Sequence, residues 1–223
     1  MTLFAFASTL EFSKMFPEVS IPENPNNITD KVISLAEGGK NLGCAAILGV
    51  GLVEFSANLS ALLNRKNELE ITSVVLVGIC GAFKGRNLQV GDVVRVDTEV
   101  VGDLGVEEKE GSFTAWSKIS GEVKKYDAAD PSSAPLWIRN LRGVSGISVN
   151  CCTGTEATAR VRAHLFNADV ESMEGAACFS ICNAFAVPAY EIRAVSNFVG
   201  TRDKSQWEIA EALEKLRELF NYE

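Results

Sequence analysis

The sequence has few groups that could bind a metal ion and no segment long enough to cross a membrane. Its 223 residues include one histidine, His164, and six cysteines without a CxxC pair. A zinc site needs closely spaced Cys or His ligands, so we expect no bound metal, and nothing else in the sequence calls for a cofactor. No apolar run approaches the roughly 18 residues of a membrane-spanning helix, so no membrane partner is expected.

Clusters of positive charge are missing as well. Lys and Arg never occur more than two in a row, and the formal net charge is −8. A surface of this charge repels polyanions, so nucleic acid is not an expected partner. The first sixteen residues lack a basic start and carry Glu11, which favours a first strand over a secretory signal peptide. Reduced thiols then account for the cysteines, and we expect a cytoplasmic protein.

What is present is an alternation of strand and helix patterns. We expect strands near 2–8, 44–50, 72–79, 91–102, 145–150, 168–171 and 188–196. Helical spacing occurs at 51–66, at 154–166 after Thr153 as a possible N-cap, at 173–186, and at 204–220 with an apolar stripe that begins at Trp207. Cys178 and Cys182 should face the core from the third of these helices.

This alternation predicts one domain over residues 1–223, with three layers in an α/β/α arrangement around a central twisted, mixed sheet. Hydrophobic residues make up 47% of the chain, which is enough for a substantial core. The segment 103–143 is polar and has no long period. We interpret it as a variable insertion that serves as a lid or an oligomer contact.

Polar residues or glycines follow several of the expected strands, where open α/β sheets bind their ligands. Ser8 and Glu11 follow the first strand, and the stretch "VGICGAF" ends a later strand with Ile79, Cys80 and Gly81. Small residues let a flat ligand approach the backbone, although such a stretch can also be a plain tight turn. The GxxxxGK[ST] spacing of a phosphate-binding loop is absent.

Two further stretches place polar side chains at the start of a helix and at the end of a strand. In "ADVESMEGAA", Met173 and Glu174 begin a helix that reads as buried. Acidic residues in a first helical turn often only complement the helix dipole, but a buried carboxylate needs donors, and the two vicinal hydroxyls of a ribose would supply them. In "EIRAVSN", a buried strand ends on the neutral amide of Asn197.

The order of these stretches resembles the superfamily of nucleoside phosphorylases and nucleosidases, in particular the bacterial purine nucleosidases. The matching stretches are Glu11, the Gly-rich strand end 78–81, Met173-Glu174, "RAVSN" at 193–197 and "VGDVV" at 90–94. The resemblance covers almost all of the chain and is weak only in 103–143. It implies a nucleoside phosphorylase-like fold and a small-molecule nucleoside substrate. It also implies that Glu11 handles the attacking water, that Met173 and Glu174 hold the ribose, and that Asn197 meets the purine.

Within that superfamily, three stretches are most similar to the futalosine hydrolases. They are "GDLGVE" (102–107), "TGTEATA" (153–159) and "VSNFVGTRDKSQW" (195–207). That family hydrolyses the N-glycosidic bond of futalosine, a 6-oxopurine nucleoside with a carboxyphenyl ketone at its 5′ position, in a bacterial route to menaquinone. The resemblance implies release of hypoxanthine and dehypoxanthine futalosine here. It also implies a homodimer or larger homo-oligomer in which a neighbour helps to close the 5′ pocket.

The amide of Asn197 bears on the choice of base. Similar adenine-acting nucleosidases carry Asp at this place, and a protonated Asp offers one donor and one acceptor to N7 and the 6-amino group. Hypoxanthine has an acceptor oxygen at position 6, to which an amide NH₂ can donate while the amide carbonyl faces the N7–H that forms. Asn197 therefore favours hypoxanthine, unless it only caps a turn. Because Asn cannot transfer a proton, N7 is protonated by water or stabilised by hydrogen bonding alone.

The remaining roles concern water and the 5′ carboxylate. Glu11 is the predicted base, with Ser8 helping to hold the water, unless Glu11 is an exposed residue at a strand end. Ile79 and Cys80 carry no hydroxyl and "FASTLEF" carries no cation, so we predict water rather than phosphate as the acceptor. Arg202 is the candidate partner of the substrate carboxylate, unless it forms an ion pair with Asp203.

Three other functions remain open from the sequence. The first is a nucleosidase for methylthioadenosine, S-adenosylhomocysteine or 6-amino-6-deoxyfutalosine. The second is a phosphorylase, and the third is a binding module that has kept the fold without activity.

Overall fold

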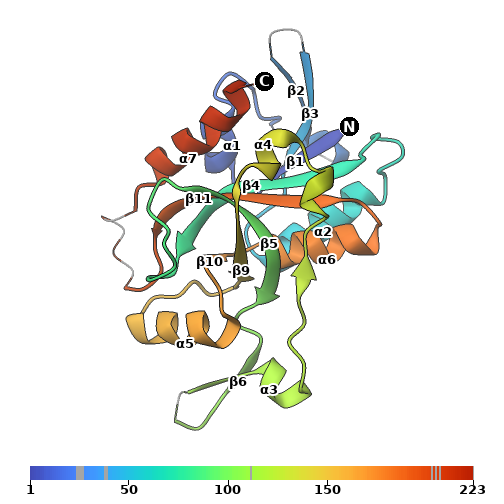
Figure 1. The fold of residues 1–223 in the computed structure, drawn as a ribbon. Helices are drawn as coiled ribbons and strands as arrows, with labels where there is room; N and C mark the ends of the chain where they lie inside the picture. The colour runs from blue at the N-terminus through green and yellow to red at the C-terminus, as the bar shows by residue number, and fades with distance from the viewer. Residues whose placement is uncertain are drawn as a thin grey trace.

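The computed structural model describes residues 1–23, 28–37, 40–110, 112–201, 203, 205 and 207–222. Its centre is a mixed sheet (Figure 1) built from β1 (Thr2–Phe6), β2 (Val32–Glu37), β3 (Lys40–Ile47), β4 (Ser73–Ala82), β5 (Val93–Val101), β9 (Arg142–Ser148), β10 (Val170–Ser172) and β11 (Ala189–Phe198). The order is β10-β9-β5-β11-β4-β1-β3-β2. β8 (Tyr126–Asp127) pairs with β5. β4 is parallel to both of its long neighbours, β1 and β11, whereas β5 runs antiparallel to β11.

One end of the sheet closes on itself. β10 pairs with β9 on one side and, antiparallel, with the last residues of β4 on the other. Strands β4, β11, β5, β9 and β10 therefore form a ring of hydrogen-bonded neighbours. The closure places Glu171 opposite Gly81 and brings the start of the segment after β10 next to the carboxyl ends of β4 and β11.

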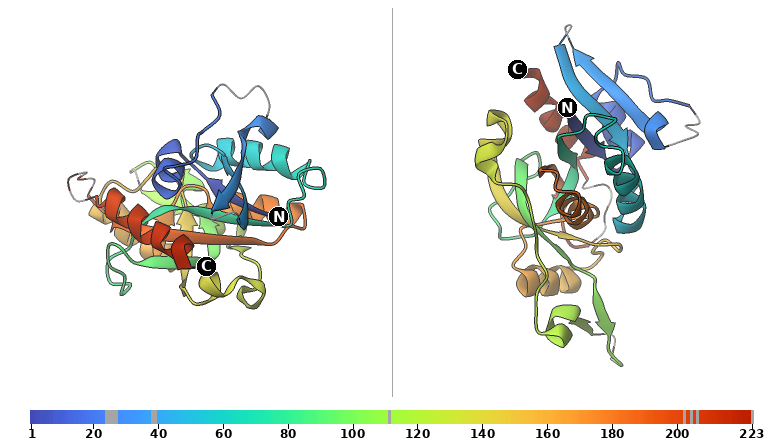
Figure 2. Two further views of the ribbon diagram at one scale, coloured as in Figure 1. Left: turned by 90° about the horizontal axis from the view of Figure 1, so that it is seen from above. Right: turned by 90° about the vertical axis from the view of Figure 1, so that its right-hand side faces the viewer.

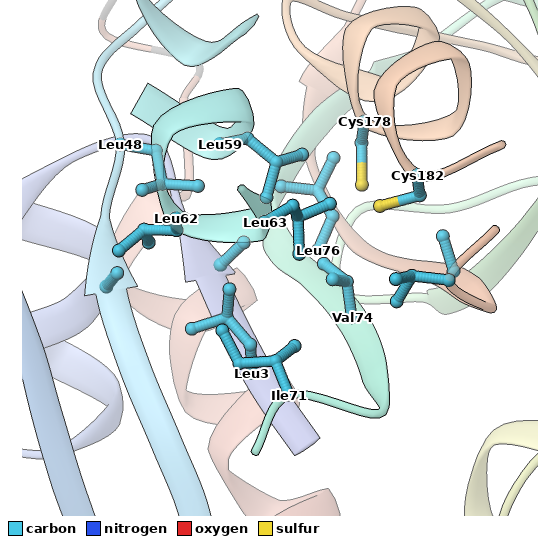
Figure 3. Close-up of a cluster of buried hydrophobic side chains, with 14 of the residues drawn as sticks. Leu3, Leu48, Leu59, Leu62, Leu63, Ile71, Val74, Leu76, Cys178 and Cys182 are labelled. Carbon is cyan, nitrogen blue, oxygen red and sulfur yellow. The ribbon is translucent and has the colours of Figure 1, made fainter. Parts of the chain in front are cut away.

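Helices cover both faces of the sheet, which confirms the predicted three-layer arrangement (Figure 2). On one face, α2 (Leu52–Leu63) and α6 (Gly175–Ala184) bury leucines of α2 together with Cys178 and Cys182 against β1 and β4 (Figure 3). On the other face, α1 (Thr9–Met15) and α7 (Ile209–Glu218) contribute Phe12 and Leu213 to a second core. The apolar periodicity of these segments thus matches their packing.

The structure corrects the sequence analysis at the amino-terminal side of the sheet. Helix α1 begins only two residues after β1, where we had expected the end of a strand. Ser8 is its N-cap and forms a capping box with Glu11, each side chain accepting a backbone N–H of the other residue. The alternative of an exposed Glu11 at a strand end is therefore wrong, because Glu11 is 7% exposed. Strand β2 was not predicted either.

Helix α5 (Glu156–Phe166) is also capped differently from the prediction. Its N-cap is Thr155, whose side chain accepts a hydrogen bond from the Thr158 N–H. Thr153, the predicted cap, instead donates from its own N–H and hydroxyl to Glu171. The cap therefore lies two residues later than the sequence suggested.

The segment after β5 contains only short elements: β6 (Gly105–Glu107), β7 (Phe113–Ala115), α3 (Trp116–Ser120), β8, the 3₁₀ turn Pro131–Ser133 and α4 (Leu136–Arg139). The hairpin β6–β7 and α3 form an arm that extends away from the sheet (Figure 1). Leu104, Trp116 and Ile119 of this arm are about half exposed. Among the residues that are described, no helix is both long and apolar enough to cross a membrane.

Candidate active site

A cavity of about 230 Å³ opens where β1, β4, β10 and β11 end. Nearly all of the residues singled out from the sequence line it, namely Ser8, Glu11, Ile79, Cys80, Gly81, Met173, Glu174 and Asn197. The exception is Arg202, which lies outside the described residues. Segments far apart in the chain therefore converge on one hollow, as expected at the carboxyl ends of strands in an α/β sheet.

Glu11 is held in a fixed orientation at the side of this cavity. Its Oε2 accepts from the N–H and the hydroxyl of Ser8, at 3.1 and 2.8 Å, and its Oε1 accepts from the Ile79 N–H at 3.1 Å. Burial raises the pKa of Glu11 above its ordinary value; the Arg193 charge opposes that rise and the Glu174 charge adds to it. Glu11 is thus an oriented carboxylate whose pKa is shifted upward, the direction that favours its action as a proton acceptor.

Gly78 is the residue that makes room for this carboxylate. A Cβ at Gly78 would lie 2.5 Å from Glu11 Oε1 and 2.6 Å from Arg193 Nη1. We expect Gly78→Ala to lower the free energy of unfolding by about 1–3 kcal/mol, because both side chains would have to move. Urea unfolding measures this change.

Gly154→Ala is the matched control for this substitution. A Cβ there meets no atom within 4 Å. Its effect should stay within about 0.5 kcal/mol. Equal stability of the two variants would show that the close packing around Gly78 does not constrain Glu11.

Glu174 sits at the N-cap of α6 and is 3% exposed. Its Oε1 accepts from the Gly51 N–H and its Oε2 from Arg193 Nη2, both at 3.1 Å. A carboxylate can accept about four hydrogen bonds, so lone pairs remain for two hydroxyls. This arrangement goes beyond a simple complement to the helix dipole, because a buried arginine holds the carboxylate in place.

Arg193 is the main site residue to which the sequence analysis assigned no role. It is 1% exposed and donates to Glu191 Oε1 at 2.7 Å, to Glu174 Oε2 at 3.1 Å and to the Ile79 carbonyl at 3.3 Å. Burial lowers the pKa of its guanidinium, but the surrounding carboxylates outweigh burial and keep that pKa above its ordinary value. A signal was present in the sequence, since Glu191 and Arg193 occupy alternate positions of an otherwise apolar strand.

Asn197 reaches the cavity through a bulge in β11. The pairing with β4 shifts register between Val195 and Asn197, and such bulges re-aim side chains next to active sites. Its Oδ1 accepts from the Ser196 hydroxyl at 2.9 Å, and its Nδ2 donates to the Phe198 carbonyl at 3.1 Å. A carboxamide has two hydrogens and two lone pairs, so one of each remains for a ligand.

The residues at the end of β4 shape the wall beside Asn197. A Cβ at Gly81 would lie 2.8 Å from Val199 Cγ2 and 3.2 Å from Asn197 Nδ2. Cys80 is buried, and burial raises the pKa of its thiol to about 12, so it stays neutral. Gly81 therefore permits the close approach of Asn197, and Cys80 offers no charge.

Met173 also lines the cavity, and its sulfur lies 3.4 Å from Cys152 Sγ. Glu171 also lines the cavity, but both of its oxygens accept from Thr153, and Arg162 forms an ion pair with it at 3.1 Å. Glu171 therefore fixes the loop before α5. Trp207, expected in the apolar stripe of the last helix, instead precedes α7, is half-buried and lines the cavity.

Comparison with known proteins finds similar sequences and similar folds. A family model described as the phosphorylase superfamily matches residues 26–221. A futalosine hydrolase from Thermus thermophilus is 32% identical over 172 residues, which span 75% of this chain and 75% of that protein. One from Streptomyces coelicolor is 35% identical over 144 residues, or 64% of this chain and 61% of that protein. A crystal structure of the 5′-methylthioadenosine/S-adenosylhomocysteine nucleosidase from Helicobacter pylori, with butyl-thio-DADMe-Immucillin-A, shares the fold. Its TM-score is 0.77 at 14% identity, over 99% of this chain and 95% of that chain.

Proposed function

The chain belongs to the phosphorylase superfamily, and from that premise we propose that it hydrolyses the N-glycosidic bond of futalosine. The products are hypoxanthine and dehypoxanthine futalosine, which places the enzyme in the futalosine route to menaquinone. The observation that carries the proposal is that the neutral amide of Asn197 lines the same cavity as the buried carboxylates Glu11 and Glu174.

Cleavage of the bond leaves an electron-poor sugar and an electron-rich base, as in other glycoside hydrolyses. Glu174 accepts from the 2′- and 3′-hydroxyls with its remaining lone pairs, and Met173 packs against the ribose. Glu11 has three of about four acceptor positions filled by Ser8 and Ile79. The position left on Oε1 orients the attacking water and takes its proton.

The departing base is recognised by Asn197. Its free N–H donates to O6 of hypoxanthine, and its free carbonyl lone pair faces the N–H that forms when water protonates N7 of the departing base. A 6-amino group would leave that donor facing another donor. Sites that hydrogen-bond one pattern discriminate strongly against another, because buried groups are left unsatisfied.

Water is the acceptor that fits the charges of the site. Among the described residues that line the cavity, Arg193 is the one cation, and its guanidinium is already bonded to two carboxylates. No described lining residue is therefore free to neutralise a phosphate. Leu10 and Val50, half exposed at the cavity, suit the aromatic 5′ substituent. Arg202 stays the proposed partner of its carboxylate.

The experiment is an assay of purified protein with futalosine in phosphate-free buffer. We expect hypoxanthine to be released at a rate that added phosphate does not change, and no pentose 1-phosphate to form. Methylthioadenosine, S-adenosylhomocysteine and 6-amino-6-deoxyfutalosine form the second arm. Faster release of adenine than of hypoxanthine would favour the alternative nucleosidase, and turnover that requires phosphate would identify a phosphorylase.

The pH dependence of the reaction reports on Glu11. The base must be ionised, and burial raises its pKa, so kcat/KM should fall on acidification at a higher pH than the ordinary carboxyl value of 4.5. Ser8→Ala removes a hydrogen bond that lowers this pKa and should move the acid limb to still higher pH. The exposed Thr9→Ala variant should leave the limb in place. If the acid limb of the kcat/KM profile stays at the same pH in Ser8→Ala, this result would argue against Glu11 as the base.

Two further properties belong to the proposal. The buried cysteines Cys44, Cys80, Cys178 and Cys182 carry free thiols, which supports a reducing, cytoplasmic location. The half-exposed apolar residues of the arm, Leu104, Trp116 and Ile119, support a homodimer or larger assembly formed through residues 103–143.

A further inference from the structure

Two glutamates behind the cavity are fully buried and lie outside the cavity lining. Glu99 on β5 and Glu191 on β11 are both 0% exposed. Each has one oxygen, Glu99 Oε1 and Glu191 Oε2, with no hydrogen-bond partner among the described residues. Buried polar atoms are nearly always satisfied, and an unpaired buried charge is costly. Two orphan acceptors in one core therefore require an explanation.

Both orphan oxygens lie beside Gly175, the first residue of α6. A Cβ built on Gly175 would collide with Glu191 Oε2 and would lie 2.7 Å from Glu99 Oε1. The same hypothetical atom would touch both carboxyl groups, so the absence of a side chain at Gly175 leaves the space that both of them border. Two ionised carboxylates do not share such a space, because like charges at short range raise the pKa of one of them.

The hydrogen bonds on one side show where a proton would sit. The Ala176 N–H donates to Ser148 Oγ at 2.8 Å, so the Ser148 hydroxyl donates to Glu99 Oε2, also at 2.8 Å. This leaves Glu99 Oε1 as the one oxygen of Glu99 that can carry a proton and donate.

The hydrogen bonds on the other side fix the acceptor. Glu191 Oε1 accepts from Arg193 Nε at 2.7 Å, and this hydrogen bond favours the ionised form of Glu191, whereas Glu99 has no such cationic partner among the described residues. Arg193 Nη2 in turn donates to Glu174 Oε2 at 3.1 Å. A single proton on Glu99 Oε1, donated to Glu191 Oε2, therefore completes one directed chain from Ala176 to Glu174.

We propose that Glu99 and Glu191 share one proton, and that this acid–carboxylate pair positions Arg193 and through it Glu174. Both are positioning residues, since neither reaches the cavity. The shared proton is inferred from the burial and contacts of the two glutamates, whereas its effect on ribose binding rests on the proposed function.

The charges around the pair are consistent with one retained proton. Burial and the Glu191 charge hold the pKa of Glu99 well above its ordinary value. Burial also raises the pKa of Glu191, against the opposing charge of Arg193. The titratable groups around the pair are Arg193 on β11, Glu174 at the N-cap of α6, Cys178 on α6, Cys80 on β4 and Tyr126, which pairs with Glu99 from β8. Glu11 on α1 acts on Arg193. Arg193 is the one cation in this set.

The proton itself is tested by infrared difference spectroscopy on the intact protein. Near neutral pH, we expect the C=O band of a protonated carboxyl group, sensitive to D₂O. It should persist in Glu11→Gln and vanish in Glu99→Gln. Absence of the band from the wild-type protein, or its persistence in Glu99→Gln, would overturn the proposal. If Glu99→Gln does not fold, absence of the band from the wild-type protein, or its loss in Glu11→Gln, still overturns the proposal.

Stability provides a second readout that needs no nucleoside. A carboxyl whose pKa is raised on folding binds its proton more tightly in the folded state, so stability falls as pH rises from the unfolded to the folded pKa. Glu99→Gln mimics the protonated acid, because its NH₂ can donate to Glu191 while its carbonyl accepts from Ser148. The fall in unfolding free energy above the ordinary carboxyl range should therefore be smaller in Glu99→Gln. An unchanged pH slope would contradict a proton held by this pair.

Steady-state kinetics test the effect of the Glu99–Glu191 pair on nucleoside binding. Glu99→Ala should raise KM for the nucleoside by about tenfold, the effect of weakening one charged hydrogen bond, with a smaller change in kcat. Glu99→Gln should restore KM to near the wild-type value. Equal KM in both variants would limit the pair to a structural role. Because the spectroscopic and unfolding tests use no substrate, failure of the futalosine assignment is distinguishable from failure of this proposal.

Discussion

Glu11→Gln is expected to lower kcat for base release by about 10²–10⁴-fold while the nucleoside still binds, which is the range for loss of a general base. Glutamine keeps the size of the side chain but cannot take a proton from water. Its amide also meets two backbone donors, the N–H groups of Ser8 and Ile79, and can accept from only one of them through its single oxygen. A loss of about 1–3 kcal/mol in stability should therefore accompany the loss of rate.

Stopped-flow or steady-state release of hypoxanthine, together with equilibrium binding of the nucleoside, measures the two effects separately. Glu18→Gln is the matched control, because Glu18 is exposed beyond the same helix. It should retain full activity. Unchanged base release in Glu11→Gln would remove Glu11 from the mechanism.

Asn197→Asp is expected to reverse the base preference of the enzyme. The carboxyl group replaces the amide donor, so kcat/KM for futalosine should fall by about 10²–10³-fold, the usual effect of losing one preorganised donor. When protonated, the acid matches the N7 and 6-amino pattern of adenine, and cleavage of 6-amino nucleosides should rise relative to futalosine. Gly81 lies close to Asn197 Nδ2. Neither the amide nor the carboxyl side chain at position 197 therefore has much room to move away.

The measurement compares kcat/KM for futalosine and 6-amino-6-deoxyfutalosine in the wild-type protein and in the variant. Asn183→Asp introduces the same change at an exposed position near the end of α6 and should leave the ratio of the two constants unchanged. An equal loss on both substrates in Asn197→Asp would count against its role in reading the base.

The regular elements could be predicted because their signals are local. The buried strand β4 carries a continuous apolar run, β11 is apolar apart from Glu191, Arg193 and its polar end, and α2 and α6 have apolar residues at helical spacing. Helix α1 was missed although its signal was present, since Ser8 and Glu11 have the spacing of a capping box. Its seven residues follow β1 so closely that they read as an extension of the strand.

The candidate site could be assembled from the sequence only in part. Glu11, Glu174 and Asn197 stand at strand or helix ends, where a ligand is expected. The pairing of β10 with β4 and the cluster of Glu99, Glu191 and Arg193 depend on contacts between distant segments, which periodicity does not encode. The proposed contact of Arg202 remains a prediction, because that residue lies outside the described part of the chain.

The most direct test of base recognition is a crystal structure of the wild-type protein with hypoxanthine. We predict that the base occupies the cavity lined by Glu11, Glu174 and Asn197, with O6 and N7 both within hydrogen-bond distance of the Asn197 carboxamide. A base bound elsewhere, or one whose O6/N7 edge faces away from that amide, would contradict the account.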